Sequence, residues 1–314
     1  MGGKKVLLDC DPGHDDAAAI MLACANDEID VLGISTVAGN QTCAKTFRNA
    51  LSVLALIREE IPVAKGCEGP LLRELTTAHQ IHGETGLDGA TLPSDIPPPC
   101  QKHAVQLITE TLLSCEEKAY VVATGPLTNI AVSLLVAPEI RQKIEAFVLM
   151  GGGVFDSNIT PAAEFNIYVD PEAARIVFES GARITMVGLD ATNKAVLTYE
   201  DIHALKERGG RVSTVTSDLL MYYARAVERA VGIGGAPLHD ALAVAAVIDL
   251  EIVDTRRLHV EVETQGELTR GATVADVNRV TGREPNADVA FELDLPRFKD
   301  FMFEALFKLD ERWD

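Results

Sequence analysis

Four carboxylates lie within the first sixteen residues of the chain. The segment Asp9–Asp16 reads Asp-Cys-Asp-Pro-Gly-His-Asp-Asp, follows the apolar run 6–8 and precedes a helical run at 17–23. A strand, a tight turn and a helix are therefore expected in that order. Crowded carboxylates repel one another, and a hard cation such as Ca²⁺ or Mg²⁺ relieves that repulsion. One or two aspartates would suffice to cap the helix, so four predict a metal or catalytic site.

Composition limits the classes of partner. The chain has 314 residues, 47% of them hydrophobic, which suits a large buried core. It carries 28 basic and 47 acidic residues, a net charge of -19. An acidic surface disfavours phosphate backbones and anionic membranes, so neither a nucleic acid nor a membrane is expected as a partner. Neutral small molecules and cations remain as ligands.

The cysteines and the start of the chain indicate a compartment. None of the six cysteines forms a C-x-x-C pair, so neither a zinc site nor a disulfide framework is expected. A strand begins at once and runs into acidic residues, which differs from a signal peptide. No apolar stretch reaches the length of a membrane span. We expect a reduced, cytoplasmic protein.

Strands and helices alternate along the first half of the chain. Apolar, β-rich runs are expected to form strands at 6–10, 31–37, 120–123, 147–150 and 184–188. Helical periodicity occurs at 44–58, 104–113, 129–136 and 171–179. This alternation predicts an α/β fold with a mostly parallel central sheet flanked by helices. With no linker, repeat or low-complexity segment, we expect residues 1–314 to form a single domain.

Two other regions depart from that alternation. Residues 66–101 are rich in Gly and Pro, and a loop of this length is usually functional or disordered. The second half predicts helices near 199–208, 212–231, from 239 onward and at 296–310. Runs at 258–263, 272–276 and 289–293 are expected to add a few extra antiparallel strands.

Polar clusters follow several of the predicted strands. They are Val37–Gln41, Ala123–Asn129 and Met150–Gly153, with Asn158, Glu164 and Asn166 soon after. His239-Asp240 opens a late helix. Each cluster alone has a structural explanation as a turn, a helix start or a buried histidine. Because the carboxyl ends of parallel strands form the ligand-binding edge of a sheet, their coincidence favours one site.

Together these segments resemble the nucleoside hydrolase family, of the inosine–uridine-preferring type and its ribonucleoside hydrolase relatives. The segments that carry the resemblance, in family order, are Asp9–Asp16, Val37–Thr42, Ile81–Gly89, Gly125–Ile130, Met150–Gly153, Ala163–Asn166, Asp170–Ala174 and His239-Asp240. Any one of them is weak evidence, and the whole set is highly specific.

The resemblance implies an N-ribohydrolase that splits a ribonucleoside into free base and ribose with one bound Ca²⁺. Carried over by position, the ligands of the ion are Asp11, Asp16, the carbonyl of Thr124 and Asp240. Oxygen ligands gathered from distant loops suit such an ion. The resemblance also implies a homo-oligomer, either a dimer or a tetramer.

The chemistry implied is the hydrolysis of an N-glycosidic bond through an oxocarbenium-like transition state, which parallels O-glycoside hydrolysis. Asp11 would take a proton from the attacking water, and His239 would protonate the leaving base. Residues expected to bind the substrate are Asp15, Asn40, His82, Met150, Asn158, Glu164 and Asn166. His82 is a second candidate on the base side, or a histidine that packs the loop.

The preferred base stays open. The motifs resemble the pyrimidine-preferring branch most, whose members often carry Gln and Tyr where this chain has Val227 and Val231. Neither valine can hydrogen-bond or stack as those residues do. Tyr222, Tyr223, Arg225 and Glu228 can substitute for them or can be surface residues. The alternatives are preference for uridine and cytidine, a broad pocket that includes inosine, or another nucleoside-like substrate. Scarcity of Lys and Arg in the matched segments favours nucleosides over nucleotides.

Two other functions are compatible with part of the pattern. Asp9-Cys10-Asp11 is the D-x-D signature of haloacid dehalogenase-type phosphohydrolases, with Asp9 as nucleophile, although the segment that follows differs from theirs. A non-catalytic nucleoside- or sugar-binding protein would use the same sugar-binding residues. Binding alone would need neither Asp11 nor His239, which argues for the enzyme.

Overall fold

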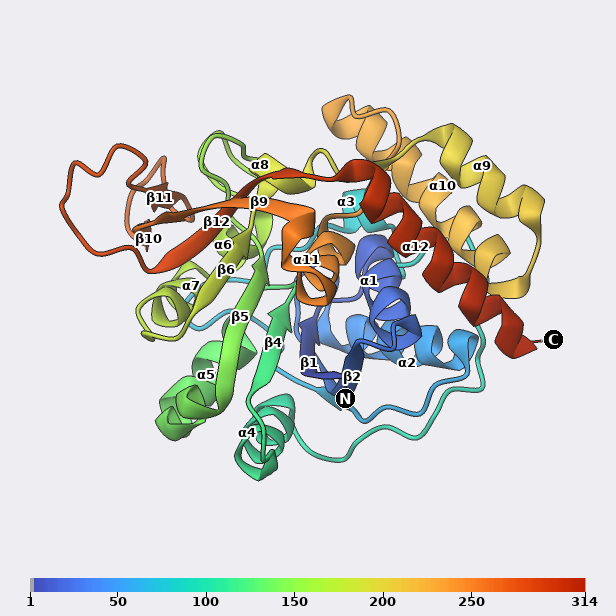
Figure 1. Ribbon diagram of the computed structural model, residues 1–314, viewed down its shortest axis with the longest axis horizontal. Coiled ribbons are helices and arrows are strands. Elements are labelled where there is room, and N and C mark those ends of the chain that lie inside the picture. Colours follow the sequence, from blue (N-terminus) through green and yellow to red (C-terminus); the bar gives the residue numbers. More distant parts are fainter. Residues whose placement is uncertain (1–2, 314) are drawn as a thin grey trace.

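The central feature of the computed structural model, which describes residues 3–313, is an eight-stranded sheet (Figure 1). Its strands in spatial order are β3 (Val63–Lys65), β2 (Ile29–Thr36), β1 (Lys4–Cys10), β4 (Ala119–Ala123), β5 (Ile144–Met150), β6 (Ile184–Val187), β12 (Ala287–Leu293) and β9 (Val253–Leu258). Every neighbouring pair is parallel except β12 and β9. The predicted mostly parallel α/β fold is confirmed.

Helices cover both faces of this sheet. The longer ones are α1 (His14–Ala25), α2 (Cys43–Ile57), α4 (Ala104–Ser114), α5 (Thr128–Val136), α7 (Pro171–Phe178), α9 (Tyr199–Arg208), α10 (Arg211–Val231), α11 (His239–Ile248) and α12 (Leu295–Asp310). The shorter helical segments are α3 (His79–His82), α6 (Phe165–Val169), α8 (Leu189–Thr192), η1 (Pro138–Lys143), η2 (Leu250–Ile252) and η3 (Glu311–Trp313).

Strand β1 is buried on both faces, as its apolar sequence predicts. Val6 and Leu8 pack into the core formed with α1, α2, α11 and α12. Leu7 points the other way, into the core formed with α4, α5 and α7. Alternation of side chains along a strand produces this division. The two cores therefore hold β1 rigidly, and its carboxyl end presents Asp11 at a defined place.

The order of the strands determines where a ligand can bind. From β1 the chain continues to β2 and β3 on one side and returns to β4, β5 and β6 on the other. Helix α1, which follows β1, and α5, which follows β4, pack on opposite faces of the sheet. The loops after β1 and β4 thus separate and leave a crevice at the carboxyl edge, where α/β proteins bind ligands.

The second half of the chain differs from the prediction at two places. The run 258–263, expected as one strand, is interrupted at His259: β9 ends at Leu258, and β10 (Val260–Val262) pairs antiparallel with β11 (Thr273–Ala275). Directly after the interruption, the side chain of Asn286 accepts from the N–H of Val260 and donates to its carbonyl. Strand β12 pairs antiparallel with β9, as predicted, but it also joins the main sheet parallel to β6.

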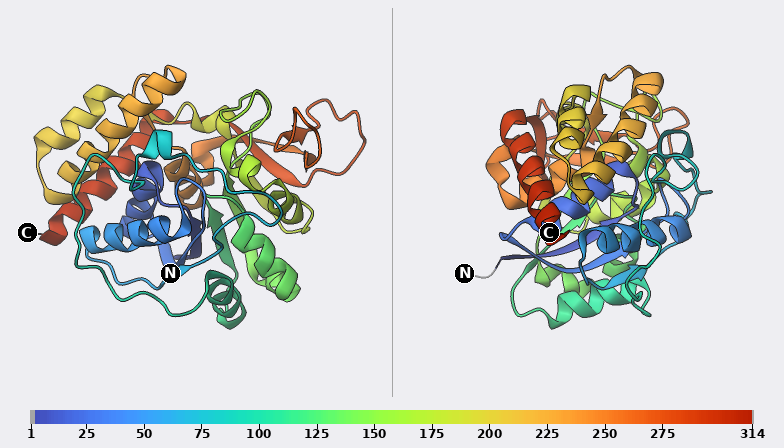
Figure 2. Two further views of the ribbon diagram at one scale, coloured as in Figure 1. Left: turned by 180° about the vertical axis from the view of Figure 1, so that it is seen from behind. Right: turned by 90° about the vertical axis from the view of Figure 1, so that its right-hand side faces the viewer.

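Two ends of the molecule carry different structures (Figure 2). Helices α9, α10 and α12 lie at one end, and the β10–β11 hairpin with its loops projects from the other. The long loop 66–101 is irregular except for the single turn of α3, as predicted. A further two-stranded pair, β7 (Val196–Leu197) and β8 (Ala236–Pro237), brings the start of α11 beside α8. Within residues 3–313 no helix is both long and apolar enough to cross a bilayer.

Candidate active site

A cavity of about 270 Å³ opens at the carboxyl edge of the sheet. Ten of the predicted site residues line it: Asp15, Asn40, His82, Thr124, Met150, Asn158, Glu164, Asn166, His239 and Asp240. The remaining two, Asp11 and Asp16, are completely buried beside it. Residues from the first and the last third of the chain therefore meet at one place, as the coincidence of polar clusters predicts.

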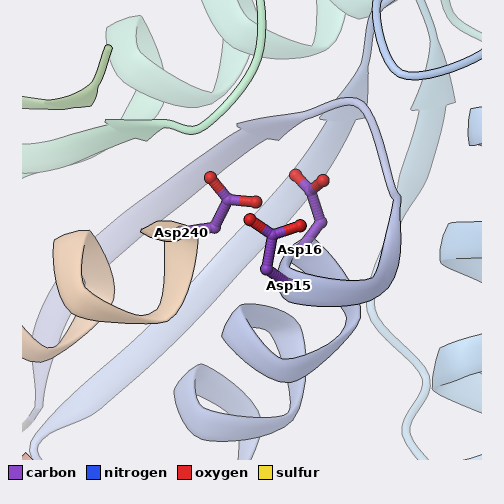
Figure 3. A group of neighbouring side chains, drawn as sticks. All are labelled: Asp15, Asp16 and Asp240. Carbon is purple, nitrogen blue, oxygen red and sulfur yellow. The ribbon is translucent and has the colours of Figure 1, made fainter. Parts of the chain in front are cut away.

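Three carboxylates form the centre of the site (Figure 3). Oxygens of Asp15, Asp16 and Asp240 lie within 4.8 Å of one another. The first two come from the first turn of α1, and Asp240 comes from the first turn of α11. Burial, together with the charge of Asp16, raises the pKa of Asp15 to about 8. Burial, together with Asp15 and Asp16, raises the pKa of Asp240.

Asp11 lies next to this group, held by the loop that follows β2. The backbone N–H of Asn40 donates to its Oδ2 at 2.6 Å. A Cβ on Gly39 would overlap that oxygen, and a Cβ on Gly125 would lie 2.6 Å from Oδ1. Burial and the charge of Asp16 raise the pKa of Asp11 well above its usual value. Two glycines are therefore needed here because the backbone approaches the carboxylate closely.

Asp16 is held by hydrogen bonds from the loops that follow β1, β2 and β4. Its Oδ2 accepts from the Gly13 N–H at 3.0 Å and from Asn40 Nδ2 at 3.1 Å. Its Oδ1 accepts from the Thr124 hydroxyl at 2.8 Å. These bonds fix the positions of the predicted ligands relative to one another before any ion binds.

The donor set fits a hard metal ion. Oδ1 of Asp11 and Oδ1 of Asp15 are buried and have no hydrogen-bond partner within residues 3–313. In the same part of the chain no Lys or Arg forms an ion pair with any carboxylate of the group. Buried carboxylates are normally paired or coordinate a metal. The cluster can hold a metal ion. The three carboxylates within 4.8 Å of one another include Asp15, which is predicted to bind substrate, and not Asp11.

Amide and carboxylate side chains form the next part of the cavity wall. Asn166 Nδ2 donates to the carbonyls of Thr124 at 2.8 Å and Met150 at 3.1 Å. Glu164 accepts from the N–H groups of Gly152, Asn166 and Ile167 at 2.9–3.1 Å. Burial raises the pKa of Glu164 to about 7. These side chains are rigidly anchored to the ends of β4 and β5, which suits the recognition of a sugar.

Both predicted histidines border the cavity. His82 Nδ1 lies 3.1 Å from His14 Nδ1, and its ring stacks on Tyr223 with centroids 5.4 Å apart. His239 Nδ1 lies 2.8 Å from the hydroxyl of Thr192. Burial lowers the pKa of His239 to about 4 and that of His82 well below its usual value. The neutral form of both rings is therefore favoured, and each ring is a stronger acid when protonated than a free imidazolium.

Helix α10 contributes an apolar wall. Val227 and Val231, which stand where pyrimidine-preferring members often carry Gln and Tyr, both line the cavity together with Ala230. Val227 is buried, whereas Val231 is 56% exposed and lies at the rim. Neither side chain offers a hydrogen bond to a ligand. The cavity wall is therefore apolar along this helix.

Several lining residues were not predicted as site residues. They are Ala78, Gln80, Ile81, Ile159, Phe165, Asn193, Tyr223, Ala230 and Ile233. Tyr223, considered only as a substitute for the missing polar pair, is buried and stacks on both His14 and His82. Burial, together with the charge of Asp15, raises its pKa. Its spacing of four from Val227 on an amphipathic helix is the signal that places both on one face.

The other substitutes and the phosphohydrolase nucleophile lie elsewhere. Tyr222 and Arg225 border a separate surface hollow, and Glu228 accepts from the Tyr199 hydroxyl at 2.6 Å. Asp9 is completely buried within the sheet, where Ser35 Oγ donates to it at 2.5 Å and Asn129 Nδ2 donates at 2.8 Å. Because Asp9 does not line the cavity, the site offers it no route to a substrate.

Comparisons with known proteins agree with this geometry. The family model described as inosine-uridine preferring nucleoside hydrolase matches residues 6–300. The chain is 47% identical over 303 residues to the pyrimidine-specific ribonucleoside hydrolase RihA of Escherichia coli, covering 96% of this chain and 97% of the relative.

Solved structures give the same result. A purine-preferring ribonucleoside hydrolase from Gardnerella vaginalis superposes with a TM-score of 0.92 at 34% identity, over 98% of this chain and all of that one. A plant nucleoside hydrolase superposes with a TM-score of 0.90 at 32% identity, over 96% of this chain and 98% of that one. With its motifs, fold and carboxylate site in agreement, this chain belongs to the inosine-uridine preferring nucleoside hydrolase family, whose members are hydrolases of N-glycosyl compounds.

Proposed function

We propose that the chain cleaves ribonucleosides to free base and ribose, with Ca²⁺ as its metal. The observation that carries the proposal is the buried group of Asp15, Asp16 and Asp240 at the floor of a cavity. Carboxylates that are buried without a cationic partner favour a divalent cation, and a nucleoside supplies neutral hydroxyls to bind beside it. The cavity also combines a polar wall for a sugar with an apolar wall for a base.

The ligands proposed for Ca²⁺ are Asp11, Asp16, the Thr124 carbonyl and Asp240. Oxygen-only donors from a turn, a strand end and a distant helix suit the flexible coordination of this ion. When bound, the cation supplies Lewis acidity and a positive charge that orients hydroxyl oxygens. Asp15 lies at the same floor and faces the cavity, so we assign it to the ribose hydroxyls with Asn40 and Asn166.

Asp11 is proposed as the base that accepts a proton from the attacking water. Its Oδ1 has no hydrogen-bond partner within residues 3–313, whereas Oδ2 is held by the Asn40 N–H. One oxygen is thus free to accept while the other keeps the group in place. The neighbouring carboxylates stabilise the positive charge that develops on the ribose.

His239 is proposed to protonate the leaving base. As the bond between C1′ and the base nitrogen breaks, its electron pair stays with the base, which takes a proton from the ring. Water supplies the oxygen that bonds C1′, and its proton goes to Asp11. One water is consumed for each base and ribose released. His82 borders the same cavity and is assigned to contact the base.

Pyrimidine ribonucleosides are the proposed substrates, with weak discrimination against inosine. The 47% identity to a pyrimidine-specific ribonucleoside hydrolase supports the first part. The apolar wall of Val227, Ala230 and Val231 supports the second, because apolar contacts select a base less sharply than hydrogen bonds do.

The test is sugar release from uridine, cytidine, inosine, adenosine and guanosine, with 2′-deoxyuridine as the matched control. Each is measured with Ca²⁺ and after chelation. We expect metal-dependent release of ribose, fastest from the pyrimidines, and little release from 2′-deoxyuridine. Tight binding with intact nucleoside after long incubation would instead support a binding protein. Full activity after exhaustive chelation would exclude the metal assignment.

We also propose that the chain is a homodimer or homotetramer. Leu268 and Val280, on the loops around the β10–β11 hairpin, are each 83% exposed, and Phe155 is 71% exposed. Contacts between copies would remove such side chains from water. Light scattering coupled to size-exclusion chromatography measures the state, and a monomer at all concentrations would contradict the proposal.

A further inference from the structure

Thr192 makes the hydrogen bond that holds His239 in the cavity wall. Its Oγ1 lies 2.8 Å from His239 Nδ1. The threonine is completely buried at the end of α8, and it belongs to none of the motifs that characterise the site. A buried hydroxyl aimed at one ring nitrogen of a cavity histidine is a candidate for orienting that ring.

The backbones of both partners are locked to each other. Thr192 N–H donates to the Gly188 carbonyl at 3.0 Å, which fixes the turn of α8. The N–H of Leu238, the residue before the histidine, donates to the Ala195 carbonyl at 2.8 Å. The antiparallel pairing of β7 with β8 continues this connection. The distance between the hydroxyl and the ring is therefore set by the fold and not by loose side chains.

This contact decides which nitrogen of the ring serves the substrate. With Nδ1 bonded to Thr192, Nε2 is the nitrogen left for the cavity, which His239 lines. The hydroxyl can accept from Nδ1–H while the ring is protonated, and it still accepts after Nε2 has lost its proton. Without the hydroxyl, the ring can rotate or exchange its tautomer.

We propose that Thr192 is a positioning residue for the hydrolysis, which holds Nε2 of His239 against the leaving base. The inference rests on the proposed function. In the step it assists, the proton moves from Nε2 to the base as the base leaves with the electron pair of the C1′–N bond. The Nδ1–H group keeps its hydrogen bond to the Thr192 hydroxyl throughout this step.

The test compares Thr192→Val, which keeps the shape and loses the hydroxyl, with Thr192→Ser, which keeps the hydroxyl. Each is assayed on uridine and on 4-nitrophenyl β-D-ribofuranoside, whose leaving group departs without being protonated. We expect Thr192→Val to lower kcat for uridine by about 10²-fold with KM little changed, as a misplaced catalytic group does. Cleavage of the nitrophenyl riboside stays within about twofold of wild type, since it needs no acid. Thr192→Ser restores the uridine rate.

Thr109→Val is the matched control, because the Thr109 hydroxyl bonds only backbone carbonyls within α4, far from the cavity. Equal loss on both substrates in Thr192→Val would overturn the proposal and indicate a structural role. No loss on either substrate would also overturn it.

A second measurement separates this inference from the proposed function. The ¹⁵N shifts of the His239 ring report its tautomer without any turnover. We expect one tautomer in the wild type and in Thr192→Ser, and a mixture in Thr192→Val. Identical spectra in all three proteins would overturn the inference even for an active enzyme. A wild type that cleaves neither substrate would refute the proposed function, and the spectra would still decide whether Thr192 orients the ring.

Discussion

Asp11→Asn should make the protein more stable and less active. Asp11 is completely buried, and both burial and the charge of Asp16 raise its pKa, so the ionised carboxyl disfavours the fold at pH 7. Asparagine has the same shape, and its carbonyl oxygen can still accept from the Asn40 N–H that bonds Asp11 Oδ2. The amide carries no charge into the cluster. The fold is therefore retained while the repulsion decreases.

The expected rise in Tm follows from the stability gained and from the size of the chain. Relief of strain at a functional site is worth about 1–2 kcal/mol. For 314 residues the entropy of unfolding is about 0.7 kcal/mol per degree, so the gain raises Tm by about 1–3 °C in chelator. Ca²⁺ at a hundred times its Kd adds about 2.7 kcal/mol to the wild type. Asp11→Asn has lost a charged ligand, so Ca²⁺ stabilises it less than the wild type. In Ca²⁺ the wild type therefore has the higher Tm, the reverse of the order in chelator.

The assay is thermal unfolding in EDTA and in CaCl₂, together with kcat for uridine. Loss of the base is expected to lower kcat by about 10³-fold. Asp95→Asn, which removes the same charge from an exposed site, is the control and should change neither quantity. Activity near that of the wild type would refute the assignment of Asp11 as the base. A lower Tm than the wild type in EDTA would refute the argument from repulsion.

Three further variants probe the cavity wall and the metal site. Val227→Gln adds an amide to the apolar wall and should raise the uridine-to-inosine ratio of kcat/KM about tenfold, because a buried hydrogen bond is worth about that factor. An unchanged ratio in the sugar-release assay would mean that α10 does not contact the base. Tyr223→Phe removes the hydroxyl beside Asp15 but keeps the stacking on His82. The free energy of unfolding, measured in urea, should fall by about 1 kcal/mol. A fall of several kcal/mol would contradict this expectation. Gly39→Ala places a Cβ against Asp11 and should weaken the Ca²⁺ affinity measured by calorimetry. An unchanged affinity would show that the loop can shift to accommodate the methyl group.

Local patterns were sufficient for much of the fold. The apolar strands and the helices between them lie close to their expected positions, because periodicity and turn residues act over a few neighbours. The Asp9–Asp16 segment indicates its chemistry for the same reason, since four carboxylates so close together in the sequence are unusual whatever lies elsewhere in the chain. Resemblance to a family then connected the separate segments in advance of any structure.

Contacts between distant segments were decided by the tertiary structure alone. Asp240 joins Asp15 and Asp16 because α11 packs against α1, and no local signal records that packing. Thr192 looks like an ordinary core residue in the sequence, and the pairing of β7 with β8 gives it a role. Tyr223 is one of four candidates near the base pocket, and its stacking on both His14 and His82 distinguishes it from the other three. Nor does any local pattern in the sequence indicate that Asp9 is kept out of the cavity. The sequence by itself determined which residues are chemically able to act, and the packing of elements far apart in the chain determined which of them meet, because that depends on the order of strands and the faces that helices bury.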